Sequence, residues 1–185
     1  MSHLRPALVL VAAFTLLLGV MFPLGMVGLG SAAFPTQAGG SLVMRDGRVV
    51  GSALVGQSFT GEKYFHPRPS ATTPDPYNAD ASGGSNLAAT SKALVDRVQR
   101  DMAKAGPAPV PADVVTTSAS GLDPHISPDN AERQVARVAA ARGLSKAEVE
   151  GLVAAHTEGR LFGLIGEPRI NVLLLNLALD AQPAR

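Results

Sequence analysis

The stretch ALVLVAAFTLLLGVMFPLGMV, residues 7–27, decides the fold of this chain of 185 residues. It lies inside a longer segment, residues 6–44, that contains no ionisable side chain. A helix needs about 20 apolar residues, each adding roughly 1.5 Å, to cross the hydrocarbon core of a membrane. The sequence therefore predicts one transmembrane helix. Gly19, Pro23 and Gly25 lie in its second half and predict a kink or an early end near residues 21–24.

A secretory signal peptide is the alternative interpretation of this segment. Arg5 provides a positive start, and GSAA at residues 30–33 offers small side chains for cleavage. The apolar region of a signal peptide has about 7–15 residues, so the greater length here favours an uncleaved anchor. The alternative stays open and would make the protein a secreted or anchored small binding protein with a cleaved signal peptide.

Basic residues on the two sides of the apolar segment bear on its orientation. Arg5 and the terminal amine precede it closely, whereas Arg45, offset by Asp46, and Arg48 lie well beyond its other end. Cytoplasmic flanks of membrane helices carry the excess of basic residues. We therefore expect a single-pass membrane protein with most of the chain outside the cytoplasm.

The rest of the chain predicts a domain of mixed structure. We expect residues 1–34 to form a cytoplasmic stub and the transmembrane anchor. Residues 35–185 are then a soluble extracytoplasmic α+β domain with a β-hairpin, several helices and long irregular loops. The dipeptide Asp46-Gly47 is typical of a two-residue hairpin turn and predicts strands on either side, at residues 41–45 and 48–55.

A long loop and four helices follow in this interpretation. Residues 65–86 hold four prolines and two glycines, and loops of this length are uncommon unless they bind something or pack on a partner. Apolar residues recur at helical spacing from 87 to 102, with Ser85 or Asn86 as N-cap. In the connection that follows, VVTT at residues 114–117 predicts a short strand.

Three more helices are expected, and two of them have clear signals at their ends. One begins with serine and proline at residues 127–128 and ends at the glycine at position 143. The next begins with SKAE at residues 145–148, a capping box. The last is expected from about residue 171 to residue 179. Prolines, capping residues and glycine act locally, so these signals do not depend on the rest of the fold.

Composition excludes several classes of protein. Sixteen basic and fifteen acidic side chains give a net charge of +1, which creates no overall attraction to nucleic acid. The absence of cysteine excludes disulfides, thiolate metal sites and a cysteine nucleophile. With no tryptophan and two tyrosines, the chain offers few rings on which bases could stack. Nucleic-acid binding is not expected.

No pattern in the sequence predicts catalysis or a metal site. His66, His125 and His156 lack metal-ligand spacing, and no serine lies in a nucleophile elbow. The glycines that flank residues 57–60 have the spacing of a phosphate loop, but Glu62 stands where that loop requires lysine. We prefer a strand that ends in a glycine turn at this point. We therefore expect no catalytic residue and no metal ligand.

A candidate partner contact remains, the run Gly83, Gly84, Ser85 and Asn86. Glycines that lead into a helix expose backbone N–H groups, which could hold an anion or a carbonyl of a partner protein. Helix capping explains the same residues equally well. The arginines at positions 133, 137 and 142 lie near one helix face, for which a solvated face is the ordinary interpretation.

Several irregular blocks occur in an order that resembles one family, the C subunit of the Kdp potassium-transporting ATPase. They are listed here in chain order: GSALVGQ at 51–57, YFHPRPSA at 64–71, PYN at 76–78, ASGGSNL at 81–87, ASGLD at 119–123 and NLALD at 176–180. Together with the N-terminal anchor, the resemblance covers nearly the whole chain.

The resemblance implies a non-catalytic accessory subunit of an ATP-driven, high-affinity potassium uptake complex. Its implied partners are an ATPase subunit, a potassium-binding channel-like subunit, a small helical subunit and membrane lipid. It implies a role in assembly and as a catalytic chaperone that raises the ATP affinity of the ATPase subunit. No bound cofactor is implied beyond ATP reached through that subunit, and Gln134 is the candidate nucleotide contact. A domain outside the cytoplasm could not touch ATP inside, so we prefer the outer placement over direct ATP contact.

Overall fold

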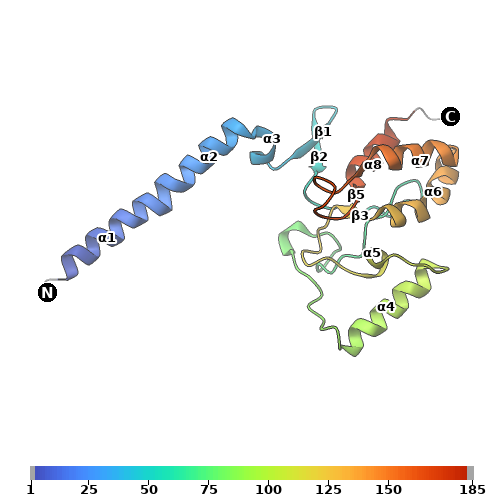
Figure 1. Ribbon diagram of the computed structural model, residues 1–185, viewed down its shortest axis with the longest axis horizontal. Coiled ribbons are helices and arrows are strands. Elements are labelled where there is room, and N and C mark those ends of the chain that lie inside the picture. Colours follow the sequence, from blue (N-terminus) through green and yellow to red (C-terminus); the bar gives the residue numbers. More distant parts are fainter. Residues whose placement is uncertain (1–2, 183–185) are drawn as a thin grey trace. The chain divides into compact units, whose positions relative to one another are not determined.

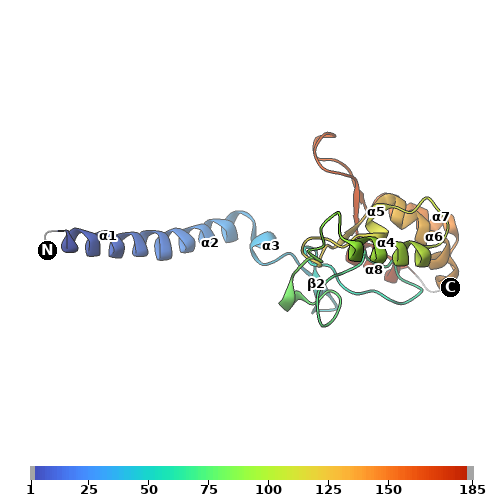
Figure 2. The same cartoon turned by 90° about the horizontal axis from the view of Figure 1, so that it is seen from below.

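The computed structural model describes residues 3–182 and divides into two compact units, Met1–Ser52 and Ala53–Arg185. The first unit holds a long helix and a hairpin, and the second holds the mixed α and β domain (Figure 1). A turned view shows the same two parts (Figure 2). The chain therefore has the expected fold class, an N-terminal apolar helix followed by helices and two small antiparallel sheets.

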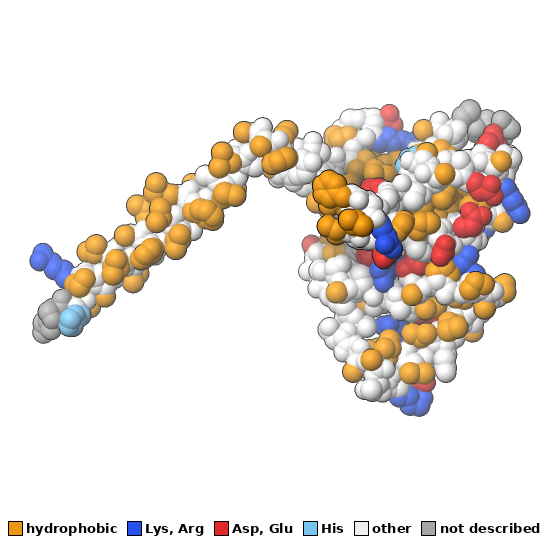
Figure 3. All heavy atoms as spheres, viewed as in Figure 1, with side chains coloured by type: hydrophobic (Ala, Val, Ile, Leu, Met, Phe, Trp, Pro, Cys, Tyr) orange, Lys and Arg blue, Asp and Glu red, His pale blue; other side chains and the backbone are white. Residues whose placement is uncertain are grey.

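The anchor is one continuous helix of 30 residues, Leu4–Ala33, with a mean hydropathy of 2.5 over its most apolar window. It consists of α1 (Leu4–Leu16), a π-helical segment (Leu17–Met21) and α2 (Phe22–Ala33). None of its residues is buried, and Figure 3 shows hydrophobic side chains along its visible face. A surface of this kind needs lipid or other apolar groups around it.

The predicted early end of this helix near residues 21–24 is wrong. The N–H of Phe22 bonds to the carbonyl of Leu17, five residues back, immediately before Pro23. Proline lacks an N–H and clashes with the regular turn before it, and a local π turn is one way in which a membrane helix adjusts. The irregularity is therefore absorbed within the helix, which continues to Ala33.

The predicted hairpin is confirmed. After the short helix α3 (Pro35–Ala38), strand β1 (Leu42–Arg45) pairs antiparallel with β2 (Arg48–Ser52). Asp46 and Gly47 take the positive φ angles, 51° and 75°, that a two-residue turn of this type requires. Strand β2 ends at Ser52, three residues earlier than expected.

The second unit is built around three C-terminal helices and a small sheet. The sheet contains β3 (His125–Ile126), β5 (Arg169–Asn171) and β4 (Thr157–Glu158), in that order and antiparallel. Helices α6 (Pro128–Arg142) and α8 (Val172–Asp180) pack against β5, and α7 (Lys146–Ala155) packs against α6 and α8. The core comprises Phe65, Ile126, Ala131, Val135, Val138, Ala139, Val149, Val153, Ile170, Val172, Leu175 and Leu179.

The predicted start and stop of α6 and the predicted start of α7 are confirmed, and α8 lies where the last helix was expected. Ser127 caps α6, which ends at Gly143 with a φ of 67°. Ser145 and Glu148 form the capping box of α7, and Asn171 caps α8 by accepting a bond from the N–H of Leu174. Each signal acts within one turn of the helix, which is why it is legible in the sequence.

Two local predictions are wrong. Helix α4 (Lys92–Ala105) begins after Ser91, not after Ser85 or Asn86. Asn86 has a φ of 51°, and Ser82 and Gly83 donate hydrogen bonds to the carbonyl of Ser120 in a second loop instead of entering a helix. Residues 114–117 do not form a strand, because α5 (Ala112–Val115) occupies them in part. Its Asp113 accepts bonds from the N–H and hydroxyl of Ser127, a tertiary contact that propensity does not anticipate.

Candidate functional site

The loop at residues 65–86 begins with two residues whose backbone is held by two amide side chains. Asn176 accepts a hydrogen bond from the N–H of Phe65 at 2.8 Å and donates one to its carbonyl at 3.0 Å. Gln134 does the same for His66, at 2.7 and 3.1 Å. An amide carries both a donor and an acceptor, so it satisfies a backbone unit completely. The entrance to the loop is therefore fixed to α6 and α8.

Gln134, the candidate nucleotide contact, lies half-buried in this arrangement. Besides holding His66, it donates to Asn130 and accepts from Arg137. A hollow of about 500 Å³ lies beside it and is lined in part by Lys104, Arg133 and Arg137. The hollow has the charge to hold an anion, but the amide of Gln134 is already used in holding the loop.

The interpretation of Arg133, Arg137 and Arg142 as a solvated face is wrong. Arg133 donates to the carbonyls of residues 105, 107 and 109, and Arg137 to those of residues 62 and 64. Arg142 donates to the carbonyl of Lys63 and pairs with Asp180 at 2.8 Å. Each guanidinium therefore attaches an irregular segment to the helix layer. The spacing of four residues places Arg133 and Arg137 on one face of α6, but nothing in the sequence indicates the distant carbonyl partners of the three arginines.

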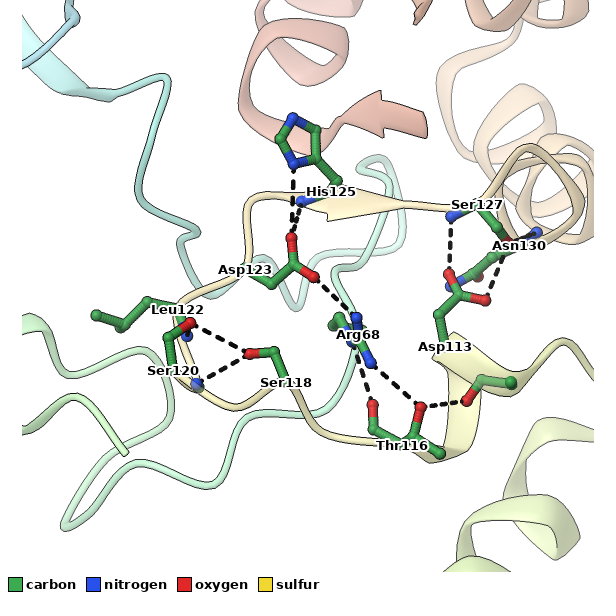
Figure 4. Close-up of polar contacts among 12 residues, drawn as sticks. Arg68, Asp113, Thr116, Ser118, Ser120, Leu122, Asp123, His125, Ser127 and Asn130 are labelled. Atoms are coloured by element: carbon green, nitrogen blue, oxygen red, sulfur yellow. Dashed lines mark hydrogen bonds and ion pairs between the residues drawn. The ribbon is translucent and has the colours of Figure 1, made fainter. Parts of the chain in front are cut away.

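A polar network organises the middle of the same loop (Figure 4). Arg68 pairs with Asp123 at 2.8 Å and also donates to the carbonyl and hydroxyl of Thr116. The hydroxyl of Tyr77 donates to the carbonyl of Arg68 at 2.6 Å. Ser70 donates to the carbonyl of Gly121 and accepts from the N–H of Tyr77. Two segments distant in sequence, residues 68–77 and 116–123, are thus joined by bonds to both backbone and side chains.

The network shifts the ionisation of two of its members. Burial raises the pKa of the Asp123 carboxyl, but hydrogen bonds from His125 and the Arg68 guanidinium outweigh burial and lower the pKa to about 2. Burial, with the charge of Asp123 adding to it, raises the pKa of the Tyr77 phenol above its usual value, against the effect of Arg68. Asp123 is therefore anionic and Tyr77 neutral over the whole neutral range.

The lowered pKa of Asp123 predicts how this domain responds to acid. A carboxyl with a depressed folded-state pKa contributes stability above its unfolded value, 3.8, and loses it as the pH falls towards 2. A shift of this size corresponds to roughly 2 kcal/mol. We expect Asp123→Asn to be less stable than the unsubstituted chain at pH 6 and to lose less stability between pH 5 and pH 2.5. Unfolding of the full-length chain in mild detergent measures both effects.

Asp46→Asn is the matched control, because the Asp46 side chain is 94% exposed. It should leave the acid response of the second unit unchanged. An identical loss of stability in acid for Asp123→Asn and the unsubstituted chain would contradict the role of this pair.

The candidate partner residues lie at the end of the same loop, against a second loop that contains Ala119 and Ser120, rather than at a helix start. The N–H of Gly83 bonds to the carbonyl of Ser120, and Gly84 packs directly on the backbone of Ala119. A Cβ on Gly84 would lie 2.9 Å from the carbonyl oxygen of Ala119, whereas a Cβ on Gly83 would meet nothing closer than 4.0 Å. Ser85 is half-buried and Asn86 exposed. Gly84 is therefore needed for packing, and Gly83 is available at the surface.

These contacts place the family-like blocks of the sequence side by side. A hollow of about 340 Å³ lies against Arg68, Asp113, Asp123 and His125. Within residues 3–182, no group of three or more histidine, aspartate or glutamate side chains is placed to hold a metal ion. The polar side chains of this region hold its loops in one conformation. The loops therefore form a surface that is ordered before any partner binds.

Residue-by-residue reasoning missed two features. The pairing of Arg68 with Asp123 joins positions 55 residues apart, and no local pattern signals it. The run LFGLIG at residues 161–166 is strongly apolar, yet its large side chains are exposed. The sequence does contain a signal for this run. It has six uncharged residues, four of them large and apolar, and it belongs to neither of the helices that flank it.

Comparison with known proteins gives a consistent result. The family model described as "KdpC: K+-transporting ATPase, c chain" matches residues 4–181. A protein of Methylobacterium nodulans named "Potassium-transporting ATPase KdpC subunit" is 58% identical, with 97% of each chain covered. A protein with the same name from Sorangium cellulosum is 60% identical, over 97% of this chain and 98% of its own. Another from Bradyrhizobium diazoefficiens is 53% identical, over 100% of both chains.

Proposed function

Because the chain belongs to the KdpC family, the c chain of K+-transporting ATPases, and has an accessory role in potassium uptake, we propose a finer description of that role. It is a non-catalytic subunit that the complex needs for assembly. It also acts as a catalytic chaperone that raises the ATP affinity of the ATPase subunit. The observation that carries this proposal is that polar side chains of the second unit hold loops in place at a surface.

The anchor supports the membrane part of the proposal. A transport subunit with one fully exposed apolar helix of 30 residues is a membrane-anchored protein. We place it in the inner membrane as a single-pass subunit with the second unit on the outer side. Support for this side comes from Arg5 in the first turn of the helix and the absence of any ionisable residue from position 6 to position 44.

The proposed partners are the ATPase subunit, the potassium-binding channel-like subunit and the small helical subunit. On the outer side the second unit cannot reach ATP in the cytoplasm. The amide of Gln134, the candidate nucleotide contact, is occupied by the backbone of His66. The effect on ATP affinity is therefore exerted through contact with the other subunits, and the site contributes shape rather than a nucleotide ligand.

The partner-contact surface in this proposal is the loop at residues 65–86, with Gly83, Gly84, Ser85 and Asn86 at its end. Loops that are ordered before binding lose less conformational entropy on association, which favours a stable complex. Asn176 and Gln134 fix the start of this loop, and Arg68 fixes its middle. Gly83 presents backbone without a side chain, so a partner can approach closely.

Affinity purification of the tagged full-length chain from native membranes in mild detergent tests the proposal. We expect a P-type ATPase and a potassium-channel-like protein to accompany it, with potassium-stimulated ATP hydrolysis. Recovery of the chain alone would refute the proposal. An intact mass corresponding to a start near Phe34 would instead favour the secreted binding protein with a cleaved signal peptide.

Gly83 offers a sharper test of the surface. We expect Gly83→Leu to reduce recovery of the other subunits by about tenfold or more, a change of roughly 1.4 kcal/mol, without altering the unfolding temperature of the chain. The space around Gly83 accepts a side chain, so the fold is preserved. Gly151→Leu, in open space on α7, is the matched control and should assemble normally. Normal assembly of Gly83→Leu would remove this residue from the interface.

A further inference from the structure

An apolar loop projects from the second unit between β4 and β5. We call residues 159–168 the apolar finger; in Figure 2 it is the orange-red loop that extends away from the helices. Its large side chains are exposed: Leu161 by 60%, Phe162 by 86%, Leu164 by 81% and Ile165 by 64%. Phe162 and Leu164 are more exposed than any large apolar side chain of the anchor helix. Contiguous exposure of this kind marks an interaction site.

The apolar finger is held in one conformation by hydrogen bonds within the loop. The N–H of Leu161 bonds to the carbonyl of Ile165, and the N–H groups of Leu164 and Ile165 bond to the carbonyl of Leu161. Phe162 and Gly163 take positive φ angles, 53° and 73°, which close the turn. Because these backbone groups already have partners inside the loop, the tip can enter an apolar environment without leaving them unsatisfied.

The charges at the base of the finger cancel. Arg160 pairs with Glu167 at 2.6 Å, and Arg169 pairs with Glu158 at 3.0 Å. Residues 161–166 between them carry no charge. A loop that binds an anionic membrane surface gains its attraction from surplus basic residues, and this one has none. An apolar centre within a polar rim that contains both signs of charge is instead the composition of a protein interface.

The base of the finger is anchored firmly. Strand β5 leads from the finger directly into α8, and its Ile170 is fully buried. Asn171, the cap of α8, also donates to the carbonyl of Ala53 at 2.8 Å. A side chain held at the tip of this finger is therefore positioned by the core of the second unit, as an anchoring residue of an interface requires.

We propose that the apolar finger inserts Phe162 and Leu164 into an apolar hollow on another subunit of the potassium-transporting complex, with a rim of mixed charge around that hollow. This proposal rests on the proposed accessory function and adds a second contact, separate from the loop at residues 65–86. A partner protein is the occupant in preference to lipid, because the charge pairs match a protein rim. Another subunit is preferred to a second copy of this chain, because the relatives are named as one subunit of an ATPase.

The chain has no cysteine, so a single cysteine introduced into the finger can be labelled specifically on this chain. Phe162→Cys is labelled with an environment-sensitive fluorophore on the purified full-length chain, which is then assembled with the other subunits in nanodiscs. We expect a blue shift of emission and at least tenfold slower reaction of the unlabelled thiol with maleimide in the complex. Lys146→Cys, on an exposed position of α7, is the matched control and should show neither change.

Three results would overturn this proposal. A label that stays exposed to water in the assembled complex removes the finger from the interface. Quenching by brominated lipids, with the chain alone in nanodiscs, makes lipid the occupant. Protection that depends on chain concentration without other subunits makes a second copy the occupant.

A prior control separates this test from the proposed function. The cysteine-free chain must first assemble with the other subunits, and its failure to do so refutes the accessory function itself. Assembly followed by an exposed label refutes only the finger. A second variant, Phe162→Ser with Leu164→Ser, should lower recovery of the partner at least tenfold while the unfolding temperature of the chain is unchanged. Unaltered recovery of the partner by this double variant would also refute the finger contact.

Discussion

Replacing Gly56 by alanine is expected to destabilise the second unit by about 3 kcal/mol, one of the two largest effects of any single substitution considered. A Cβ at this position would lie 2.5 Å from the carbonyl oxygen of Asp123 and 2.6 Å from the ring of Tyr77. Neither neighbour can withdraw easily. Gly56 itself bonds to the carbonyl of Leu122, and Tyr77 is held through its hydroxyl and its N–H. The clash therefore falls on the centre of the polar network.

Unfolding of the full-length chain in mild detergent measures this loss. The chain has only two tyrosines, Tyr64 and Tyr77, and no tryptophan, so near-ultraviolet circular dichroism reports on this region. Gly151→Ala is the matched control: it lies in open space on α7 and should stabilise the chain by about 1 kcal/mol through helix propensity. A Gly56→Ala chain as stable as the unsubstituted one would show that this close packing does not contribute to the free energy of unfolding.

Replacing Asn176 by leucine is expected to cost a similar amount, about 3 kcal/mol. Asn176 is 1% exposed, and the residue it holds, Phe65, is fully buried. Leucine keeps most of the volume but leaves the N–H and the carbonyl of Phe65 without partners, and each unsatisfied buried group costs about 1–3 kcal/mol. The same unfolding measurement applies, and assembly with the other subunits should fall as the loop entrance loosens.

Gln134→Met is the informative comparison for this prediction. It removes the equivalent bonds to His66, but this position is only half-buried, so water can replace the lost partners. The expected cost is about 1 kcal/mol. Equal costs for the two variants would contradict the argument from burial. Loss of ATP affinity in the assembled complex with Gln134→Met, at unchanged stability and assembly, would instead restore this residue as a nucleotide contact.

Local signals in the sequence were sufficient for both ends of α6, the start of α7 and the hairpin. Pro128, Gly143 and the capping box at Ser145 each act on the turn in which they lie, and Asp46-Gly47 closes its own hairpin. The anchor is equally legible, because its apolar length has to match the thickness of a membrane. The sequence predicted a kink or an early end near Pro23, not the π turn that the structure has there. A proline in a membrane helix does not by itself indicate whether the helix ends or continues with altered hydrogen bonds.

The sequence by itself determined an apolar anchor, a β-hairpin after it, most of the helices, and a set of family-like blocks. Only the tertiary structure brought those blocks together. Arg68 meets Asp123 across 55 residues, Asn176 meets Phe65 across 111, and the glycines near residue 83 pack on a second loop rather than starting a helix. The physical reason is that a backbone carbonyl or a buried carboxylate carries no sequence signature of its distant partner. Its need for a hydrogen bond is certain, but which side chain meets it depends on how the helices pack.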